Sequence, residues 1–360
     1  MKNKILFILH YSPPSHGASK VGDFIKDSQK IQDNFNCKFI KIKSSNTLKS
    51  IGKINPIKFY YVIELYFKIL FYLILFRPNK VYFTASSKGF AFYRDIVICT
   101  SWKIFSRAEI FYHYHTKGIN DFISYSKIKL RLTKFFLKNI NLVLLSPLLE
   151  NDFKKVQTYK KVLFLPNGVE NNISEDEFYK MMHSKFDHKN INILYLSNMI
   201  KEKGYFDVLK LAKTSNQNIN FHFAGGWQDE NDKKEFFDYI GNHNLQNKVF
   251  FHGFVGGEKK HNLLKSAHLF AFPSKYPNEA FPLSLLEALS YGIAVISCDE
   301  GSISSIINEN VGIIGEDISQ SLNYALENFC NLQTAKLCRS RYQKLFTLEK
   351  FENNIIKVLS

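Results

Sequence analysis

Short runs of hydrophobic residues alternate along this chain of 360 residues with longer stretches whose apolar positions recur at helical spacing. The short runs have the length of buried strands, and the longer stretches have the length of helices. Strands that alternate with helices in this way are typical of parallel sheets with helices on both faces. The predicted strands are 4–9, 37–42, 80–84, 110–114, 142–145, 191–196, 219–223, 249–252, 269–272 and 294–297. The predicted helices include 21–35, 206–214, 232–242, 259–266 and 282–291.

The strands fall into two groups that are separated near residues 165–172. Two such series predict an α/β fold of two doubly wound, Rossmann-like domains facing across a cleft. We expect an N-terminal domain over residues 1–168 and a C-terminal domain over 169–339, with the polar segment 174–190 as an inter-domain joint. One long final helix is predicted over about 333–359. Its packing partner stays open, and one option is that residues from about 340 to 360 return to the N-terminal domain.

Residues 57–76 (IKFYYVIELYFKILFYLILF) form a strongly hydrophobic helical stretch. The stretch is nearly as long as the roughly 20 residues that a membrane-spanning helix needs. Lys58, Glu64 and Lys68 would be costly at membrane depth. Three interpretations remain open: a spanning helix, a helix buried in the core, and a helix that lies on the membrane surface.

The distribution of charge adds a difference between the two halves. The whole chain has 48 Lys and Arg and 32 Asp and Glu, for a net charge of +16. Residues 1–165 contain 28 basic and 9 acidic residues, and the remainder contains 20 and 23. The first half therefore carries +19 and the second −3, which indicates that the basic half meets an acidic partner of its own.

The five cysteines form no C-x-x-C pair, which argues against a disulfide framework and a structural zinc site. They are most simply small buried residues in a reducing compartment. The apolar run at residues 5–9 is too short for a signal peptide and lacks a small-residue cleavage site. We therefore interpret it as the first buried strand.

The segment 277–292, PNEAFPLSLLEALSYG, places seven residues between Glu279 and Glu287. Glu279 follows the strand 269–272, and a helix is expected to begin near Pro282, a residue suited to the first turn. Free N–H groups at the start of this helix would suit a phosphate. Glu287, about one turn further inside, is suited to accept hydrogen bonds from two hydroxyls of a ribose. In the alternative, structural interpretation, Glu279 complements the helix dipole and Glu287 is a solvated helix residue.

Three further segments follow strands of the second half, where ligands bind in open parallel sheets. In YLSNMIKEKG, Lys203 precedes Gly204 in a turn from which its ammonium can reach a phosphate, although a solvated lysine fits there too. The segment HFAGG ends in Gly225 and Gly226, which permit either close approach to a ligand or a tight turn. In HGFV, backbone groups around Phe254 are available to the edge of a base.

The first half has its own residues at strand ends. The loop 12–19, SPPSHGAS, follows the first strand, and the N–H groups of His16 and Gly17 are placed to meet a diphosphate or an acceptor. No G-x-G-x-x-G is present, so a nicotinamide cofactor is poorly supported. His115 follows the strand 110–114 and can hydrogen-bond a sugar hydroxyl, with a satisfied structural histidine as the alternative. His113 and His115 face the same side, but without a nearby carboxylate they make a poor metal site.

Taken together, these segments resemble glycosyltransferase family 4, which has the GT-B fold. The matching pieces are PPSHGAS, HYHTKG, FLPNGVE, LSNMIKEKG, HFAGG, FHGFV and NEAFPLSLLEALSYG, and they span nearly the whole chain in the family's order. The Glu-x7-Glu block with the following ALSYG is quite specific, and the other pieces are individually weak. The resemblance implies sugar transfer from a nucleotide-sugar, usually with retention of anomeric configuration, and with neither a metal nor another cofactor bound.

The resemblance also implies a role for each matching residue. His115 and Glu279 are implied to lie at the donor sugar as catalytic residues. Lys203 is implied to bind phosphate, and Glu287 is implied to bind the ribose. The other implied donor-binding residues are Gly17, Asn198, Gly225, Phe254, Phe281 and Leu283, the last two through their backbone N–H groups.

The chain departs from the family pattern at two places. The family usually has an arginine five residues before the phosphate-binding lysine, where this chain has Asn198. An amide still donates to a phosphate oxygen, but one positive charge is missing. The family often has glycine after Phe281, where this chain has Pro282, which removes one N–H group from the turn.

The resemblance and the charge together predict a retaining hexosyltransferase that uses a UDP- or GDP-sugar. The expected acceptor is a lipid-diphosphate-linked glycan or a lipopolysaccharide, O-antigen or capsule glycan. We expect the protein in the cytoplasm, peripheral to an anionic membrane surface at the inner face of the cell membrane. An alternative is a nucleotide-sugar epimerase or another GT-B enzyme without a glycan acceptor, such as a glycan phosphorylase. A nucleic-acid-binding protein is suggested only by charge and leaves the Glu-x7-Glu block without a role, so no nucleic-acid partner is expected.

Overall fold

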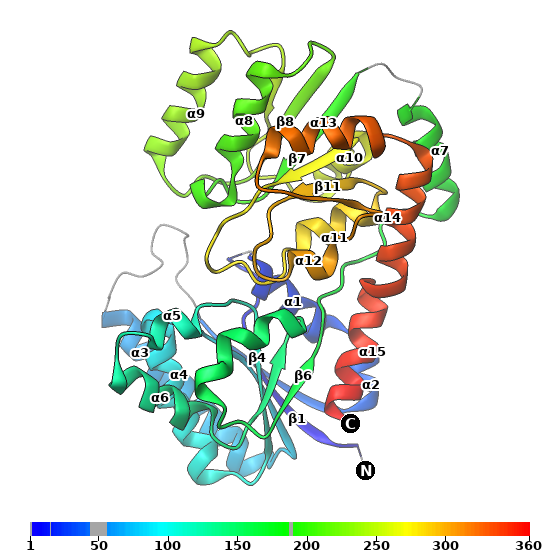
Figure 1. Ribbon diagram of the computed structural model, residues 1–360. Coiled ribbons are helices and arrows are strands. Elements are labelled where there is room, and N and C mark those ends of the chain that lie inside the picture. The colour runs from blue at the N-terminus through cyan, green and yellow to red at the C-terminus, as the bar shows by residue number, and fades with distance from the viewer. Residues whose placement is uncertain (1, 15, 44–55, 187–189) are drawn as a thin grey trace. The chain divides into compact units, whose positions relative to one another are not determined.

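The computed structural model describes residues 2–14, 16–43, 56–186 and 190–360 (Figure 1). The chain forms two compact units. Unit 1 consists of Met1–Asn167 together with Leu348–Ser360, and unit 2 consists of Gly168–Thr347. Each unit contains one sheet, so the predicted α/β class with two doubly wound domains is confirmed.

The sheet of unit 1 has six parallel strands among the described residues, in the order β2-β1-β3-β4-β5-β6. The strand β1 pairs with β2 on one side and with β3 on the other, so that Ile5 lies opposite both Cys37 and Lys80. Because helices cover both faces, β1 is buried at every position from Ile5 to Leu9. The strands are β1 (Lys4–Leu9), β2 (Asn36–Lys41), β3 (Lys80–Ala85), β4 (Glu109–Tyr114), β5 (Asn141–Leu144) and β6 (Lys161–Phe164).

The first predicted helix of unit 1, 21–35, is wrong as a single helix. It is divided at Ser28, which ends one helix and caps the next by accepting a hydrogen bond from the N–H of Ile31 at 3.2 Å. The helical segments of unit 1 are α1 (Gly17–Asp27), α2 (Gln29–Asn34), α3 (Pro56–Leu75), α4 (Gly89–Phe105), α5 (Ile119–Ile123), α6 (Lys127–Leu137), the 3-10 segment η2 (Pro147–Val156) and α15 (Leu348–Leu359).

The hydrophobic helix α3 buries one side only. Leu65, Ile69 and Leu73 lie at helical spacing and are buried. Along the described part of the chain, no helix combines the length and the hydropathy that a membrane crossing requires.

The predicted final helix over 333–359 is also wrong as one element. It consists of α14 (Leu332–Leu345) and α15, with a break at Phe346 and Thr347. Phe346 is buried in unit 2, where its carbonyl accepts a hydrogen bond from the N–H of Val169 at 2.9 Å. Residues 340–347 thus belong to unit 2, and only the helix after the break belongs to unit 1.

Helix α15 completes unit 1. It buries Phe351, Ile355 and Leu359 and packs against α2 (Figure 1). The ammonium of Lys80, at the start of β3, donates to the carbonyl of Leu359 at 2.7 Å. The first and last segments of the described chain are therefore parts of one fold.

The sheet of unit 2 also has six parallel strands among the described residues, in the order β12-β11-β10-β7-β8-β9. The strand order reverses at β7, which lies between β8 and β10, so the carboxyl ends of these three strands border the topological switch point where ligands bind in such sheets. The strands are β7 (Ile191–Leu196), β8 (Ile219–Ala224), β9 (Val249–Phe251), β10 (Leu269–Phe272), β11 (Ala294–Ser297) and β12 (Gly312–Ile314).

The segment 174–190, predicted as a polar joint, instead forms the helix α7 (Glu175–Phe186), and residues 187–189 of it lie outside the described part. Ser174 accepts a hydrogen bond from the N–H of Glu177 at 3.2 Å, and the acidic first turn complements the helix dipole. The other helical segments of unit 2 are η3 (Lys201–Lys203), α8 (Tyr205–Thr214), α9 (Glu230–Asn242), α10 (Gly257–Ser266), α11 (Leu283–Ser290), α12 (Ile303–Ile306), α13 (Ile318–Asn328) and α14.

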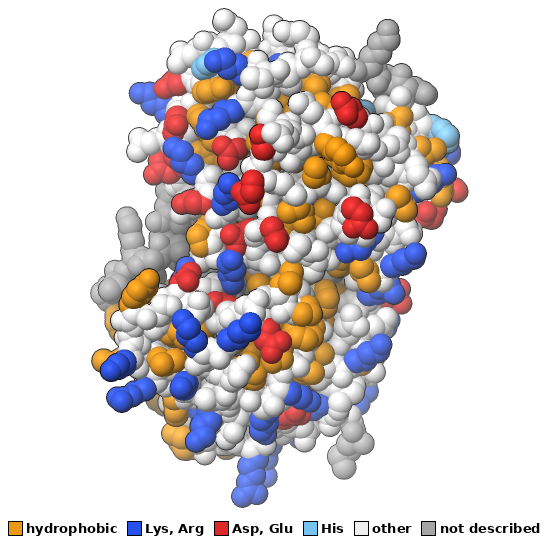
Figure 2. Space-filling model, viewed as in Figure 1, with side chains coloured by type: hydrophobic (Ala, Val, Ile, Leu, Met, Phe, Trp, Pro, Cys, Tyr) orange, Lys and Arg blue, Asp and Glu red, His pale blue; other side chains and the backbone are white. Residues whose placement is uncertain are grey.

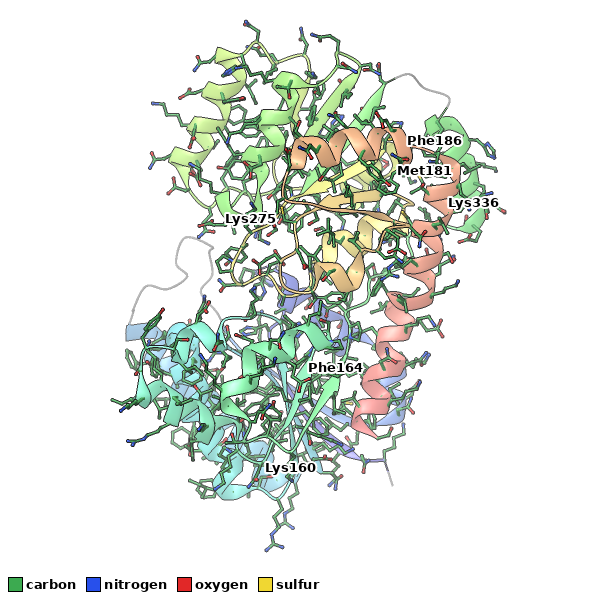
Figure 3. The ribbon with its side chains drawn as sticks, viewed as in Figure 1. Lys160, Phe164, Met181, Phe186, Lys275 and Lys336 are labelled. Carbon is green, nitrogen blue, oxygen red and sulfur yellow. The ribbon has the colours of Figure 1, made fainter. Side chains whose placement is uncertain are left out.

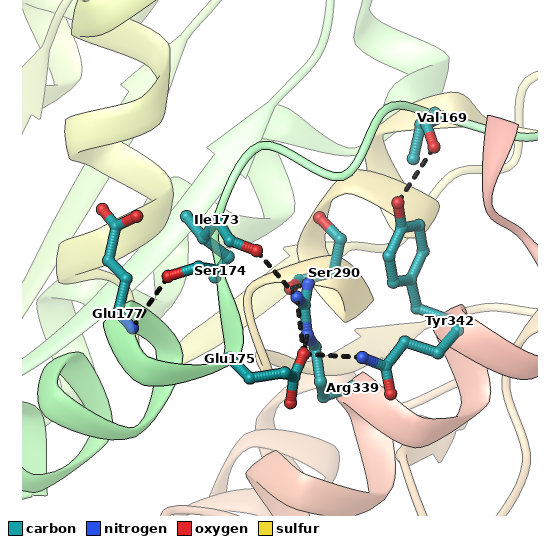
Figure 4. Close-up of polar contacts among 9 residues, drawn as sticks. Val169, Ile173, Ser174, Glu175, Glu177, Ser290, Arg339 and Tyr342 are labelled. Atoms are coloured by element: carbon teal, nitrogen blue, oxygen red, sulfur yellow. Dashed lines mark hydrogen bonds and ion pairs between the residues drawn. The ribbon is translucent and has the colours of Figure 1, made fainter.

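Arg339 joins three elements of unit 2 (Figure 4). Its buried guanidinium donates to the carbonyls of Ser290 at 2.7 Å and Ile173 at 2.9 Å, and it pairs with Glu175 at 2.9 Å. Because all these groups are satisfied by one side chain, Arg339 holds α14 against the start of α7 and the end of α11.

Candidate active site

Glu279 lies in the loop between β10 and α11, at the carboxyl edge of the sheet of unit 2. The loop is held close to Gly301, where an added Cβ would overlap the carbonyl oxygen of Glu279. Pro282 stands at the N-cap of α11 with an extended backbone, so the helix begins at Leu283. The first amides of a helix have no partner within it, which leaves N–H groups at this end to bind an anion.

Lys203 meets Glu279 directly. The lysine ends the short segment η3 after β7, and its ammonium lies 3.0 Å from a carboxylate oxygen of Glu279. The side chains are only 16% and 10% exposed. The next residue, Gly204, has φ +81°, and a Cβ there would overlap the Pro273 carbonyl. The lack of a side chain at Gly204 therefore lets the backbone beside Lys203 lie close to the segment after β10. Two of the predicted site residues, one after β7 and one after β10, are thus brought together.

Glu287 is held by a residue that the sequence did not point to. Lys260, on α10, lies 2.7 Å from its carboxylate, and both side chains are largely buried. The pair places a fixed carboxylate on α11, one turn beyond the start of the helix. Lys260 was missed because it follows Glu258 and Lys259 in what reads as an ordinary solvated helix.

The backbones that follow β7, β8 and β9 lie in close contact. The N–H of Gly225 donates to the carbonyl of Gly253 at 2.8 Å, and a Cβ on Gly225 would overlap the carbonyl oxygen of Ser197. Asn198 is partly buried beside this contact, and its carbonyl accepts a hydrogen bond from Tyr195 at 3.3 Å. The fold therefore requires glycine at position 225, for close packing against the backbone after β7.

The two predicted phenylalanines of unit 2 differ in exposure. Phe281 is buried and contacts Phe346, with 6.0 Å between ring centroids, so its backbone rather than its ring is left for a ligand. Phe254 is 69% exposed in the loop after β9.

A second lysine follows β10 in unit 2. Lys275, labelled in Figure 3, is well exposed and pairs with Glu316 at 3.3 Å.

In unit 1, His115 follows β4 and is partly buried. Burial, with a smaller effect of His16, lowers its pKa from 6.5 to about 3. Its ring lies 4.0 Å from that of His113, whose pKa burial also holds well below the usual value. His115 is therefore a neutral hydrogen-bonding group at physiological pH and not a cation.

Gly17 begins α1, directly after the cap residue His16. The imidazole Nδ1 of His16 accepts a hydrogen bond from the N–H of Ser19 at 3.2 Å, and the Ser19 hydroxyl accepts one from the N–H of His16 at 2.9 Å. A Cβ on Gly17 would meet no heavy atom within 4 Å. The fold of unit 1 does not require glycine there. Ser15 of the same loop lies outside the described residues.

A second imidazole near His115 was not predicted. His10 directly follows β1, and its ring lies 5.7 Å from that of His16. Burial, followed by the charge of Arg94, holds the pKa of His10 well below the usual value. Arg94 itself pairs with the buried carboxylate of Asp95 at 2.7 Å. The carboxyl edge of this sheet thus carries several neutral imidazoles.

The described residues hold no group of three or more His, Cys, Asp and Glu side chains placed to bind a metal ion.

Comparisons with known proteins indicate the class of protein to which this fold and site correspond. Residues 179–344 match the family model described as glycosyl transferases group 1. The whole chain has the fold of several solved structures. Sucrose-phosphate synthase from Thermosynechococcus elongatus is 15% identical with a TM-score of 0.75, covering 99% of this chain and 98% of that one. Anabaena HepE in complex with UDP and glucose is 16% identical with a TM-score of 0.70, covering 99% of both chains.

WaaG, a glycosyltransferase involved in lipopolysaccharide biosynthesis, is 13% identical with a TM-score of 0.67, covering 99% of both chains. O-antigen chain mannosyltransferase C of Escherichia coli is 29% identical over 109 residues. That match covers 28% of this chain and only 29% of the length of the mannosyltransferase.

The fold is therefore the GT-B fold of glycosyltransferases. The part that matches the group 1 glycosyl transferase model, residues 179–344, includes every site residue predicted in unit 2. The prediction of a glycosyltransferase is confirmed at the level of this matching part.

Proposed function

We propose that the protein is a retaining glycosyltransferase of family 4 that moves a hexose from a UDP- or GDP-sugar to a glycan acceptor. The observation that carries the proposal is the Lys203–Glu279 pair beside the amino end of α11. A cation and free helix amides at the carboxyl edge of a parallel sheet suit a diphosphate. HepE, which shares the fold, has been solved with UDP and glucose and with UDP-glucose.

The proposal assigns the donor to unit 2 in three parts. The diphosphate binds the backbone N–H groups of Phe281 and Leu283 and the ammonium of Lys203, with Asn198 as an amide donor. The ribose hydroxyls bind Glu287, whose carboxylate Lys260 already orients. The base lies by the backbone of Gly225 and Phe254.

The chemistry needs no dedicated nucleophile. The bond from the anomeric carbon to the diphosphate oxygen breaks as the acceptor hydroxyl forms a new bond from the same face. The acceptor's proton passes to the departing phosphate oxygen. Lys203 and the α11 amides stabilise the charge on the leaving diphosphate, so neither a metal nor another cofactor is required. Glu279 positions the sugar hydroxyls from unit 2. In unit 1, the neutral His115 and Gly17 keep the roles that the family resemblance implies for them, at a sugar hydroxyl and at a diphosphate.

We propose a lipid-diphosphate-linked or lipopolysaccharide, O-antigen or capsule glycan as the acceptor of unit 1, at the cytoplasmic face of an anionic membrane. The excess charge supports this assignment, because unit 1 carries +19 while unit 2 carries −3. On the face shown in Figure 2, Lys and Arg dominate the charged side chains of unit 1. Among proteins with similar structures or sequences are WaaG and the O-antigen mannosyltransferase.

Thermal shifts of the protein with UDP, GDP, ADP and their sugars, measured with EDTA, test the donor. We expect one nucleotide class to raise the Tm, and Glu287→Ala to weaken that effect. The control variant is Lys201→Met, which should leave the nucleotide-induced rise in Tm unchanged. Lys201 is 53% exposed and pairs with Glu235 outside the proposed site. Stabilisation by no nucleotide would overturn the proposal, and turnover of a nucleotide-sugar to a new isomer without any acceptor would favour an epimerase.

A further inference from the structure

Helix α3 exposes a stripe as apolar as the side that it buries. Tyr60, Ile63, Phe67, Phe71 and Ile74 recur at intervals of three and four residues, which places them on one side of the helix. Each is between 57% and 64% exposed. A continuous exposed row of large apolar residues is uncommon on a soluble surface and marks a site of interaction.

The apolar surface continues onto α4. The two helices pack together, with 5.6 Å between the ring centroids of Phe59 and Phe90. On α4, Tyr93, Val97 and Ile104 are exposed as well. The apolar surface is therefore at least two helices wide.

Helix α6 borders this surface with positive charge. Lys127, Arg131 and Lys134 follow one another at helical spacing and are exposed, and Lys138 follows at the end of the helix. Lys103 joins α4 to α6, since its ammonium donates to the carbonyl of Lys138 at 2.7 Å. The apolar and basic rows are thus parts of one surface.

The topology explains why these rows face the same way. The connections β2-α3-β3, β3-α4-β4 and β4-α6-β5 all step across the sheet in one direction. Parallel crossovers are right-handed, so the three helices cover the same face of the sheet. Figure 1 shows them together on one side of unit 1. Since each helix buries its other side, the exposed rows lie on the side away from the sheet.

We propose that this α3–α4–α6 face docks on an anionic lipid bilayer. The helices lie in the plane of the membrane, the apolar row enters the boundary between headgroups and acyl chains, and the α6 row meets anionic headgroups. The charge argues against a second copy of the chain as the occupant, because two faces each carrying the basic row would repel. This inference deepens the proposed function by naming the surface that brings unit 1 to a membrane-bound acceptor.

Flotation with vesicles tests the proposal on the full chain. We expect the protein to float with phosphatidylcholine vesicles that contain phosphatidylglycerol, and to be released substantially at about 0.5 M salt, where charge attraction is screened. Phe67→Ser with Phe71→Ser should lose flotation. The control, Phe237→Ser with Leu345→Ser, changes exposed apolar residues of unit 2 and should float normally.

The charge is tested in the same way. Arg131→Gln with Lys134→Gln should weaken flotation at least several-fold. The control, Lys160→Gln with Lys161→Gln, removes the same amount of charge from the exposed start of β6. It should leave flotation unchanged, since Lys160 lies at another part of unit 1 (Figure 3).

Three results would overturn the proposal: no flotation of the unaltered protein, equal flotation of each variant and its control, or conversion of a dimer to a monomer by the α3 variant with flotation unchanged. The nucleotide-induced thermal shift is measured on the same variants. Because the α3 and α6 residues lie outside the proposed donor site, a loss of flotation with a normal shift separates this proposal from the proposed function.

Discussion

The ammonium of Lys203 and the carboxylate of Glu279 lie 3.0 Å apart, although β7 and β10 bring them from segments separated by more than 70 residues. The pair is largely buried, so each charge depends on the other for compensation. A diphosphate that arrives at α11 would share Lys203 with Glu279. The contact therefore prepares a positive group before the substrate is present.

Lys203→Met should lower both stability and nucleotide affinity. It leaves the Glu279 carboxylate without its cation, which should cost about 1–3 kcal/mol of unfolding free energy, less than for a fully buried pair. Binding of the nucleotide diphosphate should weaken by about tenfold or more. Chemical denaturation and calorimetric titration measure the two effects. Lys201→Met should change neither, and equal behaviour of the two variants would contradict the assigned role.

A thermodynamic cycle tests the ribose contact by combining Glu287→Gln in the protein with removal of the ribose hydroxyls from the ligand. The unaltered protein should bind a ribonucleoside diphosphate roughly tenfold more tightly than its 2′,3′-dideoxy analogue, because the carboxylate accepts from both hydroxyls. In the variant this preference should largely disappear. Calorimetric titration of both ligands against both proteins gives the coupling energy. A preference that survives the substitution would show that the ribose binds elsewhere.

The buried histidines of unit 1 should make its stability depend on acid. The pKa of His115 falls from 6.5 to about 3 on folding, so the unfolded chain binds the proton first as the pH falls. The stabilisation is complete above pH 6.5 and is lost as the pH decreases toward about 3, by at most about 1.4 kcal/mol per pH unit for each histidine. His115→Asn should flatten the dependence of unfolding free energy on pH in this window. An unchanged slope would contradict the burial of the neutral imidazole.

Lys185 should make the stability of unit 2 depend on pH in the alkaline range. Burial lowers its pKa from 10.5 to about 7, while its ammonium donates to the carbonyl of Ala267 at 2.7 Å. Since the unfolded chain holds this proton more tightly, stability should rise as the pH increases from about 7 toward 10.5. Lys185→Met should abolish that rise, as followed by denaturation at several pH values. Lys265→Met, at an exposed lysine paired with Glu177, serves as the control.

Gly225→Ala should destabilise unit 2 by about 3 kcal/mol or more, because the new methyl group would overlap the carbonyl oxygen of Ser197 and force the strand ends apart. Gly226→Ala is a matched control, since a Cβ there meets no heavy atom within 4 Å. Thermal unfolding of the two variants compares them directly. Similar Tm values would mean that the strand ends are not held together as described.

The strands were the most predictable part of the fold. All ten predicted strands overlap observed ones. Most of them are buried on both faces and therefore read as uninterrupted apolar runs, whereas the edge strands β2 and β9 are partly exposed. The strands β6 and β12 were missed. Both are short strands at sheet edges, and β6 is partly or fully exposed at every position.

The helix boundaries depended on contacts that the local pattern does not contain. The break between α14 and α15 follows from Phe346, which is buried in unit 2. Lys203 and Glu279 were predicted as site residues because each follows a strand, but their direct contact depends on β7 and β10 being neighbours in the sheet, which was not predicted from the sequence. Lys260, His10 and Arg94 were not predicted, because their positions depend on how helices and loops pack.

The return of α15 to unit 1 has a consequence for the order in which a new chain folds. Unit 2 is the continuous segment 168–347, so it needs no later part of the chain once residue 347 has left the ribosome. The six strands of unit 1 precede those of unit 2 along the described chain, yet unit 1 needs Leu348–Leu359 to cover Lys80 and α2. The unit whose strands are synthesised earlier is thus completed after the other.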